Sequence, residues 1–274
     1  MTTESILEKV KAFPPLDDTV TKVMAVCNDV NGSIGDLAKV VQNDPMTTAN
    51  ILKAANSPLY GFSREIKGIT QAVSIFGMDT VKGFAFSSFL QKKPDLNLEP
   101  YGIDTRDFAS ISEQQNAFVA KWLKGKKEML DILSLTSFLM EVGKIVLASV
   151  VVEHGKIDEY KEHMNAVETV SEISTIEAKV FGITNEEVTS ILLEEWNFDS
   201  EMFNAIRHLH NPENADKSVQ KYAQALHVTK TLISTHNFGK EPQVEAALEL
   251  VEKYGLDKDR FEEVVADQFN IASV

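Results

Sequence analysis

The apolar residues of this 274-residue chain recur with the period of an α-helix, and this spacing limits the possible fold more than any other feature. Between residues 34 and 41 they fall at i, i+3, i+4 and i+7, which places them on one helix face. Ser33 is expected to cap this helix, and Asp44-Pro45 to end it and begin the next. No alternating run bounded by turns predicts a strand. The pattern therefore predicts an all-α fold, a multi-helix bundle.

Further caps and glycines mark the ends of other helices. Thr70 is expected to cap a short helix that stops at Gly77, and Asp79 to open the next one. Helices are expected again over residues 108–123 and, after a short break, as one run over about 129–152.

The segment over residues 91–104 carries Pro94, Pro100 and Gly102 and little helical periodicity. Such a composition is typical of a connection. We therefore expect two packed helical subdomains, over residues 1–95 and 104–274, the second with extra helices at its carboxyl end.

The charge balance argues against polyanionic partners. The net charge is −14 and the isoelectric point about 4.9. Nucleic acids and anionic membranes both attract Lys and Arg, so neither is expected as a partner. The chain begins without the pattern of a secretory signal, no apolar run predicts a membrane span, and the single cysteine, Cys27, fits a reducing compartment. A cytoplasmic location is expected.

The residue pattern alone predicts no catalytic or metal site. A helical metal pair needs His at i and i+4, and none of the six histidines is so spaced. His208 and His210 are two apart, about 200° around a helix, and could chelate together only if the helix ended between them. Adjacent acids such as Glu186-Glu187 are expected at a solvated helix edge. No GxSxG elbow, Walker A loop or GxGxxG motif is present.

Several sequence segments along the chain resemble the HDOD family, which is related to the HD-type metal-dependent phosphohydrolases. They are, in order, FPPLDDTVTKVM, DPMTTANILKAANSPLYG and ITQAVSIFGMDTVKGFAF. The most specific mark is the Asn56-Ser57 pair at a helix end, with Tyr60 soon after. The resemblance runs from about Phe13 to Pro212 and implies that the second subdomain is a degenerate HD-like helical domain.

The resemblance also implies that the metal ligands of HD-type hydrolases have been replaced here. Those enzymes carry a segment like GLLHDIGK, and the matching segment reads SFLMEVGK, with Met140 at the His position and Glu141 at the Asp position. Asn185 stands where a downstream His would lie, and His208 and His210 lie in a segment resembling the family's His-His-x-Pro ending. A thioether and an amide are poor ligands for divalent ions, and the rest are too few to hold one with a position open for water. We therefore predict no metal, no cofactor and no enzymatic activity.

Structural roles are expected for most of these positions. Met140 should pack in the core, Gly143 should permit close helix packing, and Lys144 should pair with Glu141 at i, i+3.

Asn56 and Ser57 are expected to bond to local backbone, and Trp196 to anchor the core. A binding role for the surface around Asn56 to Tyr60, for Lys144 or for Trp196 remains the alternative.

HDOD proteins generally lack the full ligand set and are associated with signal transduction, so the resemblance implies a non-catalytic regulatory module. It would act by binding a protein partner in a signalling pathway or a small ligand. One alternative is a divergent HD-type metal-dependent phosphohydrolase using Glu141, His208 and His210. Another is a nucleotide second-messenger sensor, although the chain offers only four arginines for phosphate recognition.

Overall fold

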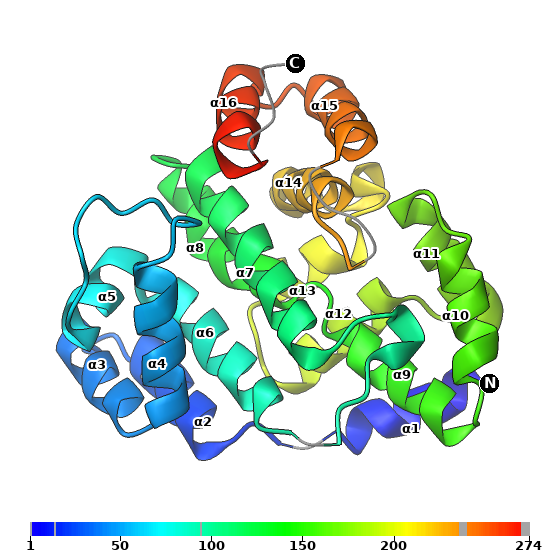
Figure 1. Cartoon of the computed structure of the whole chain (residues 1–274), viewed down its shortest axis with the longest axis horizontal. Helices are drawn as coiled ribbons and strands as arrows, with labels where there is room; N and C mark the ends of the chain where they lie inside the picture. Colours follow the sequence, from blue (N-terminus) through cyan, green and yellow to red (C-terminus); the bar gives the residue numbers. More distant parts are fainter. Residues whose placement is uncertain (1, 14, 94, 236–239, 270–274) are drawn as a thin grey trace. The chain divides into compact units, whose positions relative to one another are not determined.

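The computed structural model describes residues 2–13, 15–93, 95–235 and 240–269 (Figure 1). Within these ranges every regular element is a helix, which confirms the all-α prediction. The chain divides into two compact units, a smaller one over Pro14–Asp95 and a larger one over Met1–Phe13 with Leu96–Val274. The predicted domain division at 1–95 and 104–274 stays a prediction, and the compact units differ from it in grouping the amino-terminal helix with the larger unit.

The smaller unit has a buried helix in contact with all its other helices. Its elements are α2 (Asp18–Asn28), α3 (Ile34–Gln42), α4 (Pro45–Ala55), α5 (Ile69–Phe76) and α6 (Met78–Gln91). Helix α6 contacts each of the other four. Its Phe84 is fully buried and its Phe89 is almost so, and both belong to the core of this unit.

Two helices of the smaller unit are capped at the predicted residues. The Ser33 hydroxyl accepts the Asp36 N–H, and the Asp44 carboxylate accepts the N–H groups that open α4. The predicted cap at Thr70 is wrong, because α5 already begins at Ile69 and Gly68 is its N-cap. The helix therefore begins two residues earlier than a cap at Thr70 would place it, and its first residue, Ile69, is buried.

The larger unit holds the remaining helices. They are α1 (Thr3–Lys11), η1 (Glu99–Tyr101), α7 (Thr105–Trp122), α8 (Lys127–Leu139), α9 (Gly143–Glu153), α10 (Ile157–Asn165), α11 (Val170–Phe181), α12 (Asn185–Glu195), α13 (Ser200–Arg207), η2 (Pro212–Asn214), α14 (Lys217–Leu232), α15 (Glu241–Tyr254) and α16 (Lys258–Phe269). Helix α8 packs on α7, α13 and α14, while α9 packs on α12 and on α1. Helix α13 links the two groups, because it packs on both α12 and α14.

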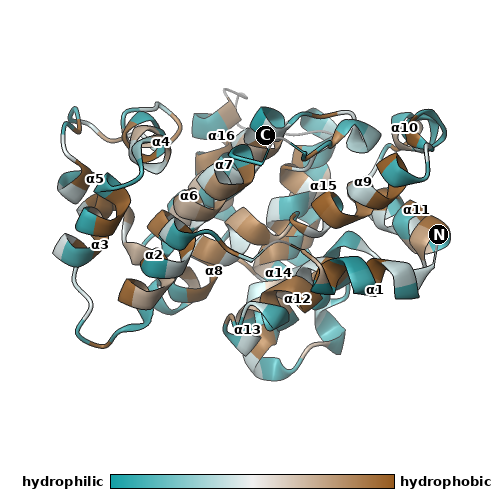
Figure 2. Cartoon of the chain, turned by 90° about the horizontal axis from the view of Figure 1, so that it is seen from below, coloured by the Kyte–Doolittle hydropathy of each residue, from teal (hydrophilic) through white to brown (hydrophobic). Residues whose placement is uncertain are grey.

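Helices α8 and α9 form the most apolar stretch of this unit. Residues Lys127–Glu153 are long and apolar enough to cross a membrane by length and composition, the one such stretch in the described residues, but 89% of the tested window is buried inside the protein. Figure 2 shows much of both helices in brown, the colour of hydrophobic residues. This burial is that of a core segment. The expected single helix over 129–152 is interrupted by a turn over 140–142, which positions the site described next.

Candidate functional site

The turn between α8 and α9 carries Met140 and Glu141, the two residues that the resemblance assigns to the His-Asp positions of the HD-type motif. Met140 is fully buried and is the C-cap residue of α8, so its side chain packs in the core as predicted. Its carbonyl oxygen accepts a hydrogen bond from Asn185 Nδ2 at 3.1 Å. Met140 therefore contributes its carbonyl oxygen to the site, whereas its thioether side chain packs in the core.

Gly143 allows the start of α9 to touch α12. A Cβ atom at this position would lie 2.3 Å from the Asn185 carbonyl oxygen and 2.9 Å from the Thr189 nitrogen. The Gly143 N–H donates to Thr189 Oγ1 at 2.8 Å, so the first turn of α9 uses α12 as its hydrogen-bond acceptor. The expected close packing at this glycine is confirmed, and any larger residue would separate the two helices.

Asn185 is a cross-link between these helices. It is the first residue of α12, which Thr184 caps as part of a capping box. Its Oδ1 accepts the Lys144 N–H at 2.9 Å, and its Nδ2 donates to the Met140 carbonyl. Both ends of the amide are therefore engaged by backbone groups of the neighbouring turn.

Five buried charged side chains surround this cross-link, and we name them the ionic cluster: Glu141, Lys144, Glu177, Glu186 and Lys230. Each is at most 2% exposed. Lys144 Nζ lies 2.6 Å from Glu141 Oε2, which is the predicted i, i+3 pair. Lys230 Nζ bonds to Glu186 Oε1 and lies 3.6 Å from Glu141 Oε2. Two ammonium groups thus face the two carboxylates of Glu141 and Glu186.

The Lys230–Glu186 pair is ionised in the buried interior. Burial alone would raise the pKa of Glu186, but the Lys230 ammonium and then His210 hold that pKa well below its usual value. Burial would likewise lower the pKa of Lys230, and the charges of Glu141, Glu186 and Glu177 raise it instead. Each charge is stable because its partners are present, as is general for buried ion pairs.

Glu177 differs from the other two acids of the cluster. It forms no ion pair with any residue in the described part of the chain, and it accepts hydrogen bonds from the Tyr101 hydroxyl at 2.8 Å and the Asn185 N–H at 2.7 Å. Burial, and then the charge of Glu186, raise the pKa of Glu177 to about 7 against the opposing effect of Lys144 and Lys230.

The two predicted histidine positions behave differently. His210 Nε2 lies 3.2 Å from Glu186 Oε1 and 3.0 Å from Ser174 Oγ, at the edge of the ionic cluster. His208 is the C-cap residue of α13, and no described contact brings it to the cluster. The structure therefore joins Glu141, Asn185 and His210 through Glu186 and Lys230, and leaves His208 outside.

The sequence did not predict three residues of the cluster, which are Glu177, Glu186 and Lys230. Of these, Glu186 was expected on the surface. Glu186 was expected at a solvated edge beside Glu187; Glu187 is exposed and completes the capping box of α12, but Glu186 is 2% exposed. Lys230 is the one Lys or Arg in the largely apolar segment ALHVTKTL. This isolated charge is the signal that could have marked the residue as buried. Glu177 offers no comparable signal, because its partner Tyr101 is distant in sequence.

The cluster offers no open site for a metal ion. In the described residues no group of three or more His, Cys, Asp or Glu side chains is placed to hold one. Glu141 Oε2 and Glu186 Oε1 already face Lys144 and Lys230. This donor set does not fit a divalent ion that also needs a position for water.

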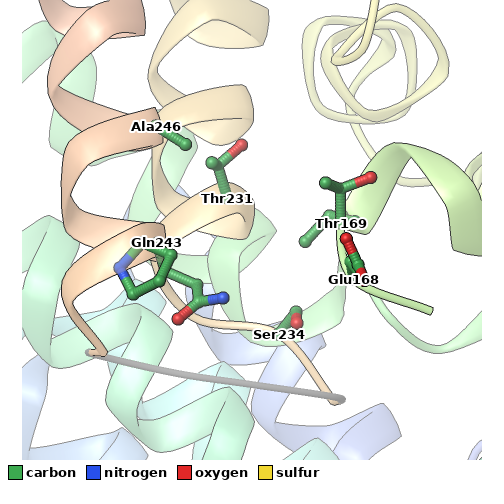
Figure 3. Close-up of a pocket in the computed structure, with 8 residues that line it drawn as sticks. Glu168, Thr169, Thr231, Ser234, Gln243 and Ala246 are labelled. Atoms are coloured by element: carbon green, nitrogen blue, oxygen red, sulfur yellow. The ribbon is translucent and has the colours of Figure 1, made fainter. Parts of the chain in front are cut away.

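A pocket of about 90 Å³ lies elsewhere in the larger unit, between the starts of α11 and α15 and the end of α14 (Figure 3). Its described lining consists of Glu168, Thr169, Val170, Thr231, Ser234, Pro242, Gln243 and Ala246. No residue of the ionic cluster lines it.

Asn56 and Ser57 serve the local backbone of the smaller unit. Asn56 Oδ1 accepts the Ile66 N–H at 2.8 Å, and its Nδ2 donates to the carbonyls of Ile66 and Leu52, both at 2.9 Å. Ser57 Oγ accepts the Leu59 N–H at 3.2 Å. The pair therefore closes the loop over residues 57–66 onto the end of α4.

The two aromatic residues of interest pack against other rings. The Tyr60 ring is largely buried, with its centroid 4.8 Å from that of Phe76. The half-buried Trp196 ring lies 5.7 Å from Phe13 in an edge-to-face arrangement and 6.4 Å from Phe198. These contacts account for both side chains as packing residues.

The pattern of one family extends over most of this fold. The model of the HDOD domain matches residues 13–212. The chain belongs to the HDOD family. None of the curated proteins compared with it matches.

Several solved structures share the HDOD fold at low sequence identity. A virulence factor from Campylobacter jejuni subsp. jejuni is 24% identical with a TM-score of 0.61, and the match covers 98% of each chain. A proposed phosphohydrolase from Shewanella amazonensis SB2B is 19% identical with a TM-score of 0.70, covering 96% of this chain and 95% of that one. A proposed signal transduction protein from Marinobacter aquaeolei VT8 is 24% identical with a TM-score of 0.63, covering 97% of this chain and 63% of that one. These similarities establish the fold.

Proposed function

We propose that this HDOD protein is a non-catalytic signal-transduction or regulatory module that acts by binding a protein partner or a small ligand. The observation that carries the proposal is the position of two lysines. The ammonium groups of Lys144 and Lys230 lie against the carboxylates of Glu141 and Glu186, beside the turn that the sequence resemblance matches to the metal-binding segment of HD-type enzymes. Metal-dependent hydrolysis needs a divalent ion that binds a water molecule and lowers its pKa. The ammonium group of a lysine does not coordinate and activate water in this way.

Charge compensation makes this arrangement hard to reverse. Two positive charges neutralise two negative ones, and all four side chains are at most 2% exposed. A divalent ion would have to displace both ammonium groups, leaving two buried cations without partners at a cost of several kcal/mol each. The amide of Asn185 is also occupied by backbone bonds, so it offers no replacement ligand.

The charge of the chain narrows the class of partner that the proposal expects. A net charge of −14 disfavours nucleic acid and anionic membranes as partners, which leaves proteins and small ligands. One structural relative is named as a proposed signal transduction protein, and another as a proposed phosphohydrolase, the main competing function.

Turnover assays test the catalytic half of the proposal. The purified chain is incubated with a nitrophenyl phosphodiester and with cyclic dinucleotides, in Mg²⁺, Mn²⁺, Fe²⁺, Ni²⁺ or Zn²⁺. We expect no hydrolysis above that of the Glu141→Gln variant. Turnover that scales with protein concentration and disappears in Glu141→Gln would establish the phosphohydrolase instead.

Capture from the native host tests the binding half. We expect the tagged chain to retain a protein at constant stoichiometry, released by an excess of untagged chain, or to gain thermal stability with a small ligand. Repeated captures that retain nothing, together with no thermal shift from nucleotides, would contradict a binding function.

A further inference from the structure

The exposed large apolar side chains in the described part of the chain all belong to the smaller unit. They are Val30, Ile34, Met46, Phe62 and Ile75. Single exposed apolar residues are common on any protein surface, but an even scatter would place most of them on the larger unit. Their confinement to one unit indicates a surface that other molecules contact.

The two units also differ in charge. The smaller unit, Pro14–Asp95, contains eight acidic residues and eight Lys or Arg residues, so it has no net charge. The remainder of the chain therefore carries the whole net charge of −14. An acidic molecule that the larger unit repels can still approach the smaller one, because salt screens charges over about 8 Å at physiological ionic strength.

Exposed cations gather between the start of α4 and the end of α5. Residues 45–76 contain Lys53, Arg64 and Lys67, all exposed, and a single acid, Glu65. Lys67 pairs with Glu65 at 3.4 Å, and their side chains are 78% and 72% exposed, so water screens this pair. Lys53 and Arg64 form no ion pair with any residue in the described part of the chain. Both can therefore pair with acids of another molecule.

Phe62 is exposed and yet held in place on the connection between α4 and α5 (Figure 1). It is 37% exposed, and its ring stacks on that of Tyr60 at 6.3 Å and meets that of Phe76 edge-on at 5.5 Å. Asn56 closes this loop onto α4, and Gly61, with a φ of 64°, allows the turn just before the ring. A ring fixed in this way loses little conformational freedom on binding, which favours affinity.

Ile75 adds a second exposed apolar side chain at the end of α5. It is 40% exposed and directly precedes Phe76, whose ring contacts that of Phe62. The loop and the end of α5 thus both present apolar area next to the exposed cations. We name these five residues the apolar–basic face: Phe62, Ile75, Lys53, Arg64 and Lys67.

We propose that the apolar–basic face docks an acidic segment of a partner protein, whose apolar side chains contact Phe62 and Ile75 while its carboxylates pair with Lys53 and Arg64. Apolar anchors with complementary charges around them are the usual arrangement of a protein interface. A symmetric contact between two copies would bring two positive faces together, and the net charge of −14 would oppose an extended anionic membrane. The inference rests on the proposed function, because it names the partner class for the binding role.

Selection from a random peptide display library on the whole purified chain tests this partner class. Peptides that also bind Phe62→Ser are removed, and we expect the rest to combine Asp or Glu with aromatic or branched apolar residues. By fluorescence anisotropy, Arg64→Glu should bind these peptides about threefold to tenfold more weakly, and rising salt should weaken wild-type binding. Lys22→Glu makes the same change at an exposed lysine of α2, outside the face, and should bind like the wild type.

Selected peptides that are basic or uncharged, or a failure to recover any peptide that distinguishes the wild type from Phe62→Ser, would overturn the proposal. Equal binding by the wild type and Arg64→Glu would do the same. If Phe62→Ser does not fold by circular dichroism, Arg64→Glu, which changes an exposed side chain, takes its place in the removal step with the same outcomes.

Two further measurements examine the other possible occupants of the face. Co-sedimentation with phosphatidylserine vesicles that is lost in Arg64→Glu would assign the face to a membrane, and a dimer lost in that variant would assign it to a second copy. Either result would overturn the proposal. Failure of these tests removes the apolar–basic face alone, because capture and thermal shift measure the proposed binding function independently.

Discussion

Replacing Lys230 with Met should destabilise the larger unit by about 3–5 kcal/mol, the usual cost of removing one partner from a buried ion pair. We expect a cost of this size because Lys230 is 1% exposed and Glu186 is 2% exposed, so water screens neither charge. Met retains most of the length of the side chain, and its substitution therefore tests the charge more than the packing. Glu186 would remain buried with His210 as its nearest possible cation.

The fluorescence of tryptophan isolates the relevant unit. Both tryptophans, Trp122 and Trp196, belong to the larger unit, so their signal during urea unfolding reports its stability without that of Pro14–Asp95. Lys221→Met on the same helix is the matched control. Lys221 is partly exposed and pairs with exposed Glu128, so its loss should change the stability far less than the loss of Lys230.

A second substitution separates lost charge from lost packing. Adding Glu186→Gln to Lys230→Met removes the uncompensated carboxylate, and we expect the double variant to recover a large part of the lost stability. The reasoning fails if Lys230→Met is as stable as Lys221→Met, or if Glu186→Gln adds its full cost to that of Lys230→Met.

Three further predictions concern the helix contacts, the family-specific loop and the response to acid. Gly143→Ala should cost about 1–3 kcal/mol in urea unfolding because its Cβ meets the α12 backbone, whereas Gly35→Ala, with only Ser33 Oγ at 3.7 Å, should not destabilise. Asn56→Ala removes the bonds that close the loop over 57–66, so limited proteolysis there should accelerate several-fold, and an unchanged rate would contradict this role. Lys92 and the Thr47 N–H outweigh burial and lower the pKa of Asp44 to about 2 from 3.8, so its contribution to stability is present above pH 3.8 and is lost as the pH falls toward 2. Asp44→Asn should remove that part of the acid dependence in circular dichroism.

Local signals in the sequence predicted most helices and several of their ends. Ser33, Asp44 and Thr184 cap helices through bonds to residues two or three positions away, so a short window contains the whole interaction. The turn over 140–142 was not predicted, because its cause is remote: Gly143 and Lys144 donate their N–H groups to Thr189 and Asn185 of α12. Periodicity within one segment carries no information about such an acceptor.

The candidate site was predictable only in part for the same reason. The family pattern located Met140, Glu141 and Asn185, and the spacing of Lys144 from Glu141 predicted their ion pair. Lys230 lies 44 residues from Glu186 in sequence, and only the fold shows that its ammonium reaches this carboxylate. The sequence alone does not distinguish a buried lysine from an exposed one. The packing around each side chain determines whether its charge needs a partner.

Metal content after loading tests most directly whether lysines have taken the place of a metal ion. The purified chain would be dialysed against Mn²⁺, Fe²⁺, Ni²⁺ or Zn²⁺ and freed of unbound metal. Its metal content would then be measured by elemental mass spectrometry. The account predicts far less than one equivalent of each metal per chain. One equivalent that is retained by the wild type and lost in Glu141→Gln or Glu186→Gln would contradict it.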